Sequence, residues 1–183
     1  MKANSLHDLY LEQLRDLYDA EHQLIKALPK MAKAASSPEL RAAFEEHLEK
    51  TNEHAQRIET IFEAMGEKAK GQKCKAMEGL VKEGREVIAE DMEDGVKDAA
   101  LIAAAQRVEH YETAGYGCVR TYATLLGDNK AATLLEETLD EEKEADQLLG
   151  NIAAKINVEI VRATNRSAKQ VANTSGRRSK PAA

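Results

Sequence analysis

Apolar residues recur at three- and four-residue spacing along four long segments, which is the pattern of amphipathic helices. The segments are residues 6–35, 38–65, 99–126 and 129–157. Ser5 and Ser37 stand at expected helix N-caps, and Gly66 and Gly127 stand where helices should end. Pro29 lies inside the first segment and predicts a kink there. We therefore expect four long helices.

The connection between the second and third segments is too long for a tight turn. It spans residues 66–94, and its periodicity predicts a short helix from about Met77 to Asp91. Helix pairs in bundles usually join through roughly 2–8 residues, so this connection should cross back along the bundle and leave the second and third helices parallel. The sequence predicts an all-α four-helix bundle with a long crossover that contains a short extra helix.

Composition supports this class, because the chain has only 10 glycines, 3 prolines and no tryptophan. The net charge of −6 conceals an asymmetry: residues 162–183 carry six basic side chains and no acid, which leaves 20 basic and 32 acidic residues in 1–161. We expect residues 1–161 to form the bundle and residues 162–183 a disordered basic tail. An acidic body with a charge of −12 disfavours nucleic acid and suits a protein that concentrates cations.

The sequence predicts a cytoplasmic protein that does not cross a membrane. Cys74 and Cys118 form no disulfide framework, and nothing resembles a secretory signal. No apolar run approaches the roughly 20 residues needed to span a bilayer.

Two acids lie inside the apolar stripe of the third long helix. With about 100° per residue, Ile102, Glu112 and Tyr116 fall within about 60° of Glu109. A buried carboxylate is costly unless it is paired or bound to a metal. Tyr116 is expected to be a core residue, with a hydrogen bond to a ligand as the alternative. This face therefore raises the question of partner groups on the other helices.

The other three long helices carry polar groups at the middle of their apolar stripes. These are Glu21 on the first, His47, Thr51 and His54 on the second, and Glu142 and Asp146 on the fourth. Carboxylates and imidazoles that converge from facing helices are what a di-metal carboxylate bundle needs. The outer acids Glu49 and Glu53, and the run from Asp140 to Glu144 apart from Glu142, are expected to be solvated.

Each of these residues also has a plainer explanation. A single inward acid can mark the edge of a helix face misjudged by one position. His47 can be a hydrogen-bonded core histidine, and Thr51 can bond back to its own helix. The coincidence on four helices is what favours a metal site.

The chain resembles the YciE/YciF-type family of bacterial stress-induced, ferritin-like proteins. The resemblance is carried by YLEQLRDLYDAEHQLIKALPKMAKAA, EHLEKTNEHAQRIETIF, CKAMEGLVKEG, AAAQRVEHYETAGYG and LLEETLDEEKEADQLL, in this order between Leu6 and about Val161. It implies a ferritin-like four-helix bundle with an added short helix, a homodimer and a rubrerythrin-like di-metal centre.

Rubrerythrin-type bundles use Glu, Glu-x-x-His, Glu-x-x-Glu and Glu-x-x-His on their four helices in turn. Thr51 stands where the second helix should carry its glutamate, before His54. Ala145 stands where the fourth helix should carry its histidine, after Glu142, with Asp146 beside it as a substitute. These departures leave open whether the second metal is held.

The ligand set that we predict is Glu21, His54, Glu109, Glu112, Glu142 and Asp146. His47, one turn from Thr51, is a candidate to compensate for the missing glutamate. The expected cofactors are two divalent metal ions, with iron first and manganese second.

Three functions are compatible with this pattern. The first is a metal-binding stress protein that reduces peroxide or oxidises ferrous iron with dioxygen or peroxide. The alternative is a non-catalytic structural or interaction bundle with a degenerate or mono-metal site, so the sequence does not decide whether the protein is an enzyme. A nucleic-acid protein acting through the basic tail is the weakest, because the acidic body opposes it.

Overall fold

The computed structural model describes residues 3–177, and the side chains of residues 3–166. It contains the helices α1 (Leu6–Ala34), α2 (Pro38–Ala64), α3 (Lys75–Ala89), α4 (Asp94–Leu125) and α5 (Asn129–Arg177). Residues 3–177 contain no strand. The predicted all-α class is confirmed, and the short crossover helix is present as α3.

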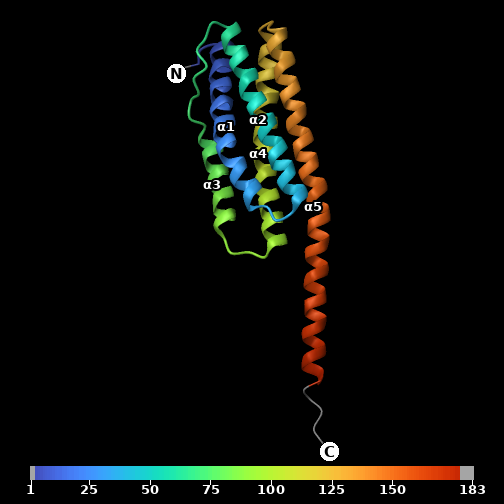
Figure 1. Cartoon of the computed structure of the whole chain (residues 1–183). Coiled ribbons are helices and arrows are strands. Elements are labelled where there is room, and N and C mark those ends of the chain that lie inside the picture. The colour runs from blue at the N-terminus through green and yellow to red at the C-terminus, as the bar shows by residue number, and fades with distance from the viewer. Residues whose placement is uncertain (1–2, 178–183) are drawn as a thin grey trace, which may run out of the picture.

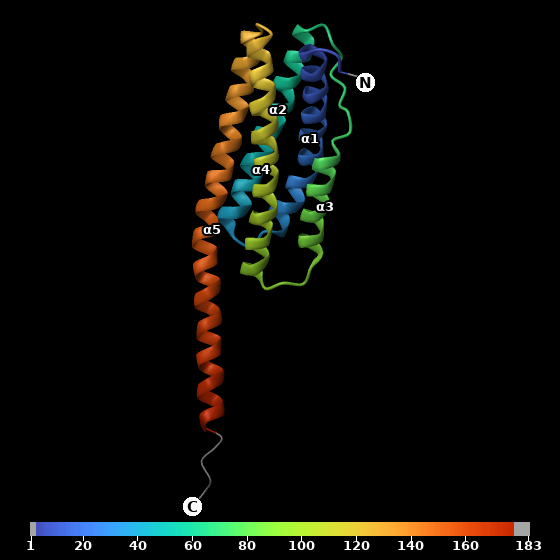
Figure 2. The same ribbon diagram turned by 180° about the vertical axis from the view of Figure 1, so that it is seen from behind.

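The four long helices form an elongated bundle (Figure 1). α1 packs on α2 and α4 packs on α5, while α1 also contacts α4 and α2 contacts α5. The crossover returns the chain along the bundle, so α2 and α4 run in the same direction, as the loop length predicts. α3 packs against the outside of α1 and α4. The same arrangement is seen from behind in Figure 2. This is the ferritin-like four-helix bundle.

The helix ends follow the local sequence. The hydroxyl groups of Ser5 and Ser37 each accept a hydrogen bond from the backbone N–H three residues later, at 3.1 and 3.4 Å. Gly66 and Gly127 end α2 and α4 with φ values of +70° and +81°, which glycine adopts without strain. α1 continues through Pro29.

Two buried polar anchors hold the connections to the bundle. Asp98 on α4 is 2% exposed and accepts three hydrogen bonds, from the N–H and Oγ of Ser36 and the N–H of Ser37, at 2.6–2.8 Å. Cys74, at the start of α3, donates its N–H to Asp19 at 2.8 Å, and its Sγ lies 3.0 Å from the hydroxyl of Tyr111. The loops therefore add to the packing of the long helices.

The apolar core is divided into two clusters. One includes Leu24, Phe44 and Ile102, and the other includes Leu17 and Ile58. On α2, α4 and α5, the inward polar residues identified from the sequence fall between the positions that contribute to the two clusters, and on α1 Glu21 lies at the start of the first cluster, just after Ala20. The polar layer is therefore sealed by apolar side chains from both ends of the bundle.

α5 differs from its prediction at its C-terminal end. Disorder is expected from Arg162, but the helix continues to Arg177 and projects beyond the bundle (Figures 1 and 2). Residues 162–175 contain no glycine or proline and include alanine, arginine and lysine, so extending an existing helix costs little. Residues 178–183 of the predicted tail lie outside the described residues. Among the described helices, none combines the length and apolar character needed to cross a membrane.

Candidate metal centre

The centre of the bundle holds six inward polar side chains from all four long helices. They are Glu21 from α1, His47 and His54 from α2, Glu109 and Glu112 from α4, and Glu142 from α5. The four carboxylates and His54 are at most 2% exposed, and the side chain of His47 is 10% exposed. This cluster is built from groups that rarely lie so deep in a protein unless they are paired or bind metals.

The cluster divides into two groups that share one residue. The first, here called the His47 group, contains His47, Glu109, Glu112 and Glu142, and the second, the His54 group, contains Glu21, His54 and Glu142. Within each group, one ligand atom from every residue lies within 4.8 Å of all the others. Glu142 is therefore the residue that the two groups share.

The shortest contacts in the cluster join imidazole to carboxylate. His54 Nδ1 lies 3.0 Å from Glu142 Oε1 and 3.7 Å from Glu21 Oε1. His47 Nε2 lies 3.5 Å from Glu109 Oε1 and 3.7 Å from Glu142 Oε2. Each histidine thus directs one ring nitrogen toward two acids.

Most of the inward atoms make no hydrogen bond of suitable geometry among the described residues, although imidazole and carboxylate atoms lie close together. This holds for both carboxylate oxygens of Glu112 and Glu142, for one oxygen each of Glu21 and Glu109, and for His47 Nε2 and His54 Nδ1. Leaving a buried polar atom unsatisfied costs about 1–3 kcal/mol, and more when the group is charged. Such a concentration of unsatisfied ligand atoms fits a site built for cations.

The electrostatics of the cluster show the same deficit of positive charge. Burial raises the pKa of Glu21 to about 8 and raises the pKa values of Glu109 and Glu112 well above their usual range. The negative charge of Glu142 adds to each of these shifts. Without cations, protons therefore neutralise these carboxyl groups.

Glu142 and the two histidines respond to one another. Burial would raise the pKa of Glu142, but His54 and His47 lower it below its usual range. Burial would likewise lower the pKa of His54, yet Glu142 and Glu21 raise it to about 9. Burial dominates at His47 and lowers its pKa. Glu142 is thus the acid that stays ionised most easily, as a residue shared by both groups requires.

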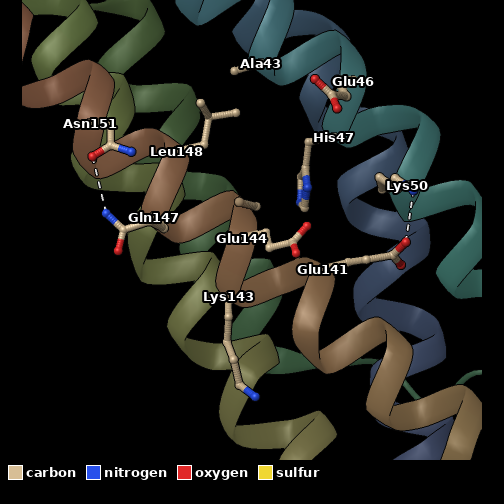
Figure 3. Close-up of a pocket in the computed structure, with 11 residues that line it drawn as sticks. Ala43, Glu46, His47, Lys50, Glu141, Lys143, Glu144, Gln147, Leu148 and Asn151 are labelled. Carbon is tan, nitrogen blue, oxygen red and sulfur yellow. Dashed lines mark hydrogen bonds and ion pairs between the residues drawn. The ribbon is translucent and has the colours of Figure 1, made fainter.

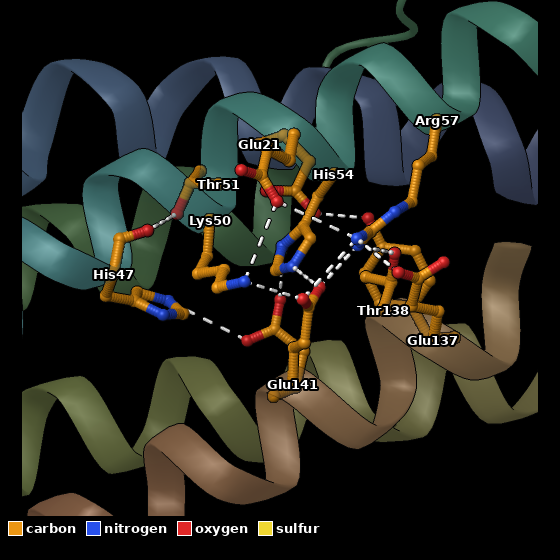
Figure 4. A network of polar contacts seen from close by, with 12 residues as sticks. Glu21, His47, Lys50, Thr51, His54, Arg57, Glu137, Thr138 and Glu141 are labelled. Carbon is orange, nitrogen blue, oxygen red and sulfur yellow. Dashed lines mark hydrogen bonds and ion pairs between the residues drawn. The ribbon is translucent and has the colours of Figure 1, made fainter.

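Glu141 supports the His54 group from outside, as Figure 4 shows. Its Oε2 lies 3.0 Å from His54 Nε2, and its carboxylate also accepts hydrogen bonds from Arg57 and Lys50. Arg57 and Lys50 hold the pKa of Glu141 at about 2, despite partial burial that opposes the shift. The sequence prediction of a solvated Glu141 is wrong, because its side chain is only 17% exposed. Glu141 precedes the inward Glu142 along α5 and also contacts two basic side chains of α2. Helical periodicity alone could not predict these contacts with α2.

Two further core residues have clear roles. Tyr116 is completely buried, as expected of a core residue, and donates a hydrogen bond to Oε1 of Glu21, one of the predicted ligands. Thr51 is also buried and donates its hydroxyl hydrogen to the backbone oxygen of His47 at 2.7 Å. Thr51 thus bonds back to its own helix, which was the plainer explanation.

Asp146, one of the six ligands predicted from the sequence, belongs to neither group. It lies one turn beyond Glu142, with its side chain 31% exposed. Its carboxylate accepts a hydrogen bond from Gln106 at 3.0 Å and lies 3.5 Å from His110 Nε2. One turn along α5 is enough to move this carboxylate to the margin of the bundle. His47 occupies the cluster in its place.

The cluster as a whole contains four carboxylates and two imidazoles, drawn from an unusual distribution of helices. Two Glu-x-x-His motifs would supply one histidine from α2 and one from α5. Here α2 supplies both, His47 and His54, seven residues apart, while Thr51 and Ala145 leave their motif positions without a ligand. The ligand inventory of a di-metal carboxylate site is therefore present although both motifs are altered.

The fold and the cluster define a ferritin-like helical bundle with a carboxylate–histidine core. The chain belongs to the family described as "Domain of unknown function (DUF892)", whose model matches residues 5–162. It is 48% identical over 154 residues to Protein YciF of Escherichia coli K12, covering 84% of this chain and 93% of that protein. The resemblance drawn from the sequence segments is confirmed, and the chain is a homologue of a stress protein.

Solved structures agree with the fold. The crystal structure of the E. coli stress protein YciF matches with a TM-score of 0.81 and 47% identity, covering 84% of this chain and 97% of that one. YcfI from Rhodopseudomonas palustris, whose description proposes a structural role, matches with a TM-score of 0.78 and 39% identity, covering 82% and 98%. A protein from Xanthomonas campestris shares the fold at 20% identity, with a TM-score of 0.68 over 88% and 99% of the two chains.

Proposed function

We propose that the protein binds two divalent metal ions, iron or secondarily manganese, in the centre of the bundle. The observation that supports this proposal is the convergence of four carboxylates and two imidazoles, most of whose inward atoms make no hydrogen bond among the described residues. Four ionised carboxylates carry a charge of −4, which two divalent cations balance when both imidazoles are neutral. Carboxylate and imidazole ligands suit both metals.

We assign the ligands to the two ions according to the two groups. Glu142 belongs to both groups and would be shared by the two ions. Glu21 and His54 complete one site, while His47 with Glu109 and Glu112 completes the other. Metal binding in this arrangement displaces the protons that otherwise neutralise the buried carboxyl groups.

Paired iron or manganese ions supply redox chemistry toward peroxide or dioxygen, and we propose peroxide reduction or ferrous iron oxidation as the activity. The chain's own residues set the conditions. Tyr116 fixes the orientation of Glu21 by its hydrogen bond, and Glu141 fixes that of His54. The two apolar clusters exclude water from both ends of the site. The stress-protein description of the E. coli relative is compatible with a role in oxidant defence.

Elemental analysis is the test of this proposal. The untagged, full-length protein is purified without chelators, beside a Glu109→Gln, Glu142→Gln variant. A Glu49→Gln, Glu63→Gln variant, changed at two exposed positions of α2, is the matched control. We expect about two iron or manganese ions per chain in the wild type and the control, and a loss of both ions in the core variant. Absence of metal after reconstitution with ferrous iron or manganese would contradict the proposal.

A second candidate is a non-catalytic structural or interaction bundle. Thr51 and Ala145 favour it, because each removes a ligand from its expected position, and so does the structural role proposed for the R. palustris relative. Peroxide consumption by the metal-loaded protein, with ferrous iron in excess as the electron donor, separates the two functions. We also propose that the chain acts as a homodimer, as its family resemblance implies, and sedimentation of the full-length protein tests this.

A further inference from the structure

A solvent-open groove between α2 and α5 reaches the cluster at one residue. It has a volume of about 480 Å³, and its lining includes Glu46 and His47 from α2 and Glu144, Ala145 and Leu148 from α5. Figure 3 shows the His47 side chain extending between the two helices, with the Glu144 side chain beside it. By contrast, the hollow under α3, lined by residues such as Val81, touches none of the six cluster residues.

His47 forms the boundary between this groove and the core. Its side chain is 10% exposed on the groove side, while Nε2 is buried 3.5 Å from Glu109 Oε1 and 3.7 Å from Glu142 Oε2. Nε2 has no hydrogen-bond partner among the described residues. A single imidazole therefore separates the groove from two candidate ligands.

Ala145 contributes a small side chain to the lining of the groove. It lies three residues after Glu142, at the position where the related motif would carry a histidine, and it lines the groove. A methyl group at this position leaves space that an imidazole would fill. The residue that leaves α5 without a histidine thus also leaves the groove unfilled beside His47.

The charges at the groove favour cations. The carboxylates of Glu46 and Glu144 line it and are exposed. Its two lysines are each paired with an acidic neighbour: Lys50 with Glu141 at 2.9 Å and Lys143 with an aspartate at 2.8 Å. Neither glutamate has an ion-pair partner among the described side chains, so the rim keeps an uncompensated negative charge that attracts cations.

We propose that divalent cations reach the core through this groove, and that His47 is the first cluster residue that binds them. This inference rests on the proposed metal centre and adds the path by which it fills. Hydrated cations collect between Glu46 and Glu144, and the His47 imidazole passes them to Glu109 and Glu142. The small side chain of Ala145 leaves the groove open as far as His47.

The test follows Co²⁺ binding to the metal-free full-length protein by stopped-flow absorbance. Ala145→Leu fills the groove with a larger apolar side chain. Ala154→Leu, an exposed position on the same helix outside the groove lining, is the matched control. We expect Ala145→Leu to slow binding at least fivefold while the final Co²⁺ stoichiometry equals that of the wild type. The control should bind at the wild-type rate.

A second variant tests the role of charge. Glu46→Gln with Glu144→Gln should slow Co²⁺ binding and reduce the dependence of the rate on ionic strength, because screened attraction at the rim is lost. Glu49→Gln with Glu63→Gln should leave both unchanged.

The outcomes separate this inference from the proposed function. If Ala145→Leu binds two ions at the wild-type rate, the path is overturned and the metal centre stands. If Ala145→Leu loses an ion at equilibrium, position 145 shapes the site itself and the path is likewise overturned. If the wild type binds no Co²⁺, the proposed function fails and the path fails with it.

Discussion

The Oε2 atom of Glu141 lies 3.0 Å from Nε2 of His54, on the opposite side of the ring from Glu142, whose Oε1 lies 3.0 Å from Nδ1. Glu141 therefore accepts a hydrogen bond from the Nε2–H group, and Nδ1 faces the core. A carboxylate that holds the far nitrogen of a ligating histidine fixes the ring and raises its basicity.

Replacing Glu141 should weaken metal binding without removing it. We expect Glu141→Gln to lower the affinity of the His54 group by about 10- to 100-fold, with unchanged stoichiometry at saturating metal. Titration with Co²⁺, monitored by absorbance, measures this. Glu137→Gln is the control, because Glu137 also forms an ion pair with Arg57, at 3.1 Å, but forms no ion pair with His54. Equal affinity in the two variants would contradict the positioning role of Glu141.

The metal-free protein should lose stability between pH 7 and pH 9. Folding raises the pKa of Glu21 from 4.5 to about 8 and that of His54 from 6.5 to about 9. In this range the folded state therefore holds protons that the unfolded state has released, so the free energy of unfolding falls as pH rises, by on the order of 1 kcal/mol per pH unit for each proton.

Urea unfolding at pH 7, 8 and 9 measures this fall. Glu21→Gln should flatten the pH dependence, because it removes one of the two groups, whereas the exposed Glu63→Gln should not. Saturating metal should suppress the fall, since bound cations replace the protons. A stability that rises with pH in the metal-free wild type would be inconsistent with the buried carboxyl groups.

Two glycines of α4 should respond in opposite ways to alanine. A Cβ atom at Gly115 would lie 2.8 Å from Leu17 Cδ2, whereas one at Gly117 would meet no atom within 4 Å. Gly117→Ala should raise the free energy of unfolding by up to about 1 kcal/mol through helix propensity. Gly115→Ala should lower it by about 1 kcal/mol, because a displacement of Leu17 outweighs the same gain. Thermal unfolding of the two variants decides, and equal stabilisation would refute the close contact of α1 and α4.

Asp98 should be a strong stabilising residue although it lies apart from the metal cluster. Asp98→Ala removes three hydrogen bonds to Ser36 and Ser37, leaving two backbone N–H groups without their acceptor. We expect a loss of about 2–4 kcal/mol in urea unfolding. Ser36→Ala, which removes a single hydroxyl donor, should cost about 1 kcal/mol. Similar costs for both changes would show that the backbone contacts contribute little.

Helical periodicity was sufficient for most of the fold. Ser5, Ser37, Gly66 and Gly127 act at the helix ends where the sequence places them, and the long connection forces the crossover. The C-terminal end of α5 is helical where the sequence predicts disorder. Low apolar content indicates that a segment cannot pack against a core, but it does not prevent the segment from extending an existing helix.

Helical periodicity predicts which site residues lie at the centre of a buried helix face, but not how residues at the margin of a face are placed. Glu21, Glu109 and Glu142 lie centrally on their faces and are deeply buried in the structure. Asp146 and Glu141 lie near face margins, where the packing partner decides, and Gln106 and Arg57 on neighbouring helices cannot be seen from the periodicity of α5. That these residues bind metal remains a prediction.

Anomalous X-ray diffraction from crystals of the manganese-loaded protein shows whether two ions bind in the cluster. We predict two anomalous peaks per chain, one between His47, Glu109 and Glu142 and the other between Glu21, His54 and Glu142. The same peaks should be absent from crystals of the Glu109→Gln, Glu142→Gln variant. A manganese-loaded crystal with no anomalous peak at the centre of the bundle, or with a single one, would contradict the two-ion centre.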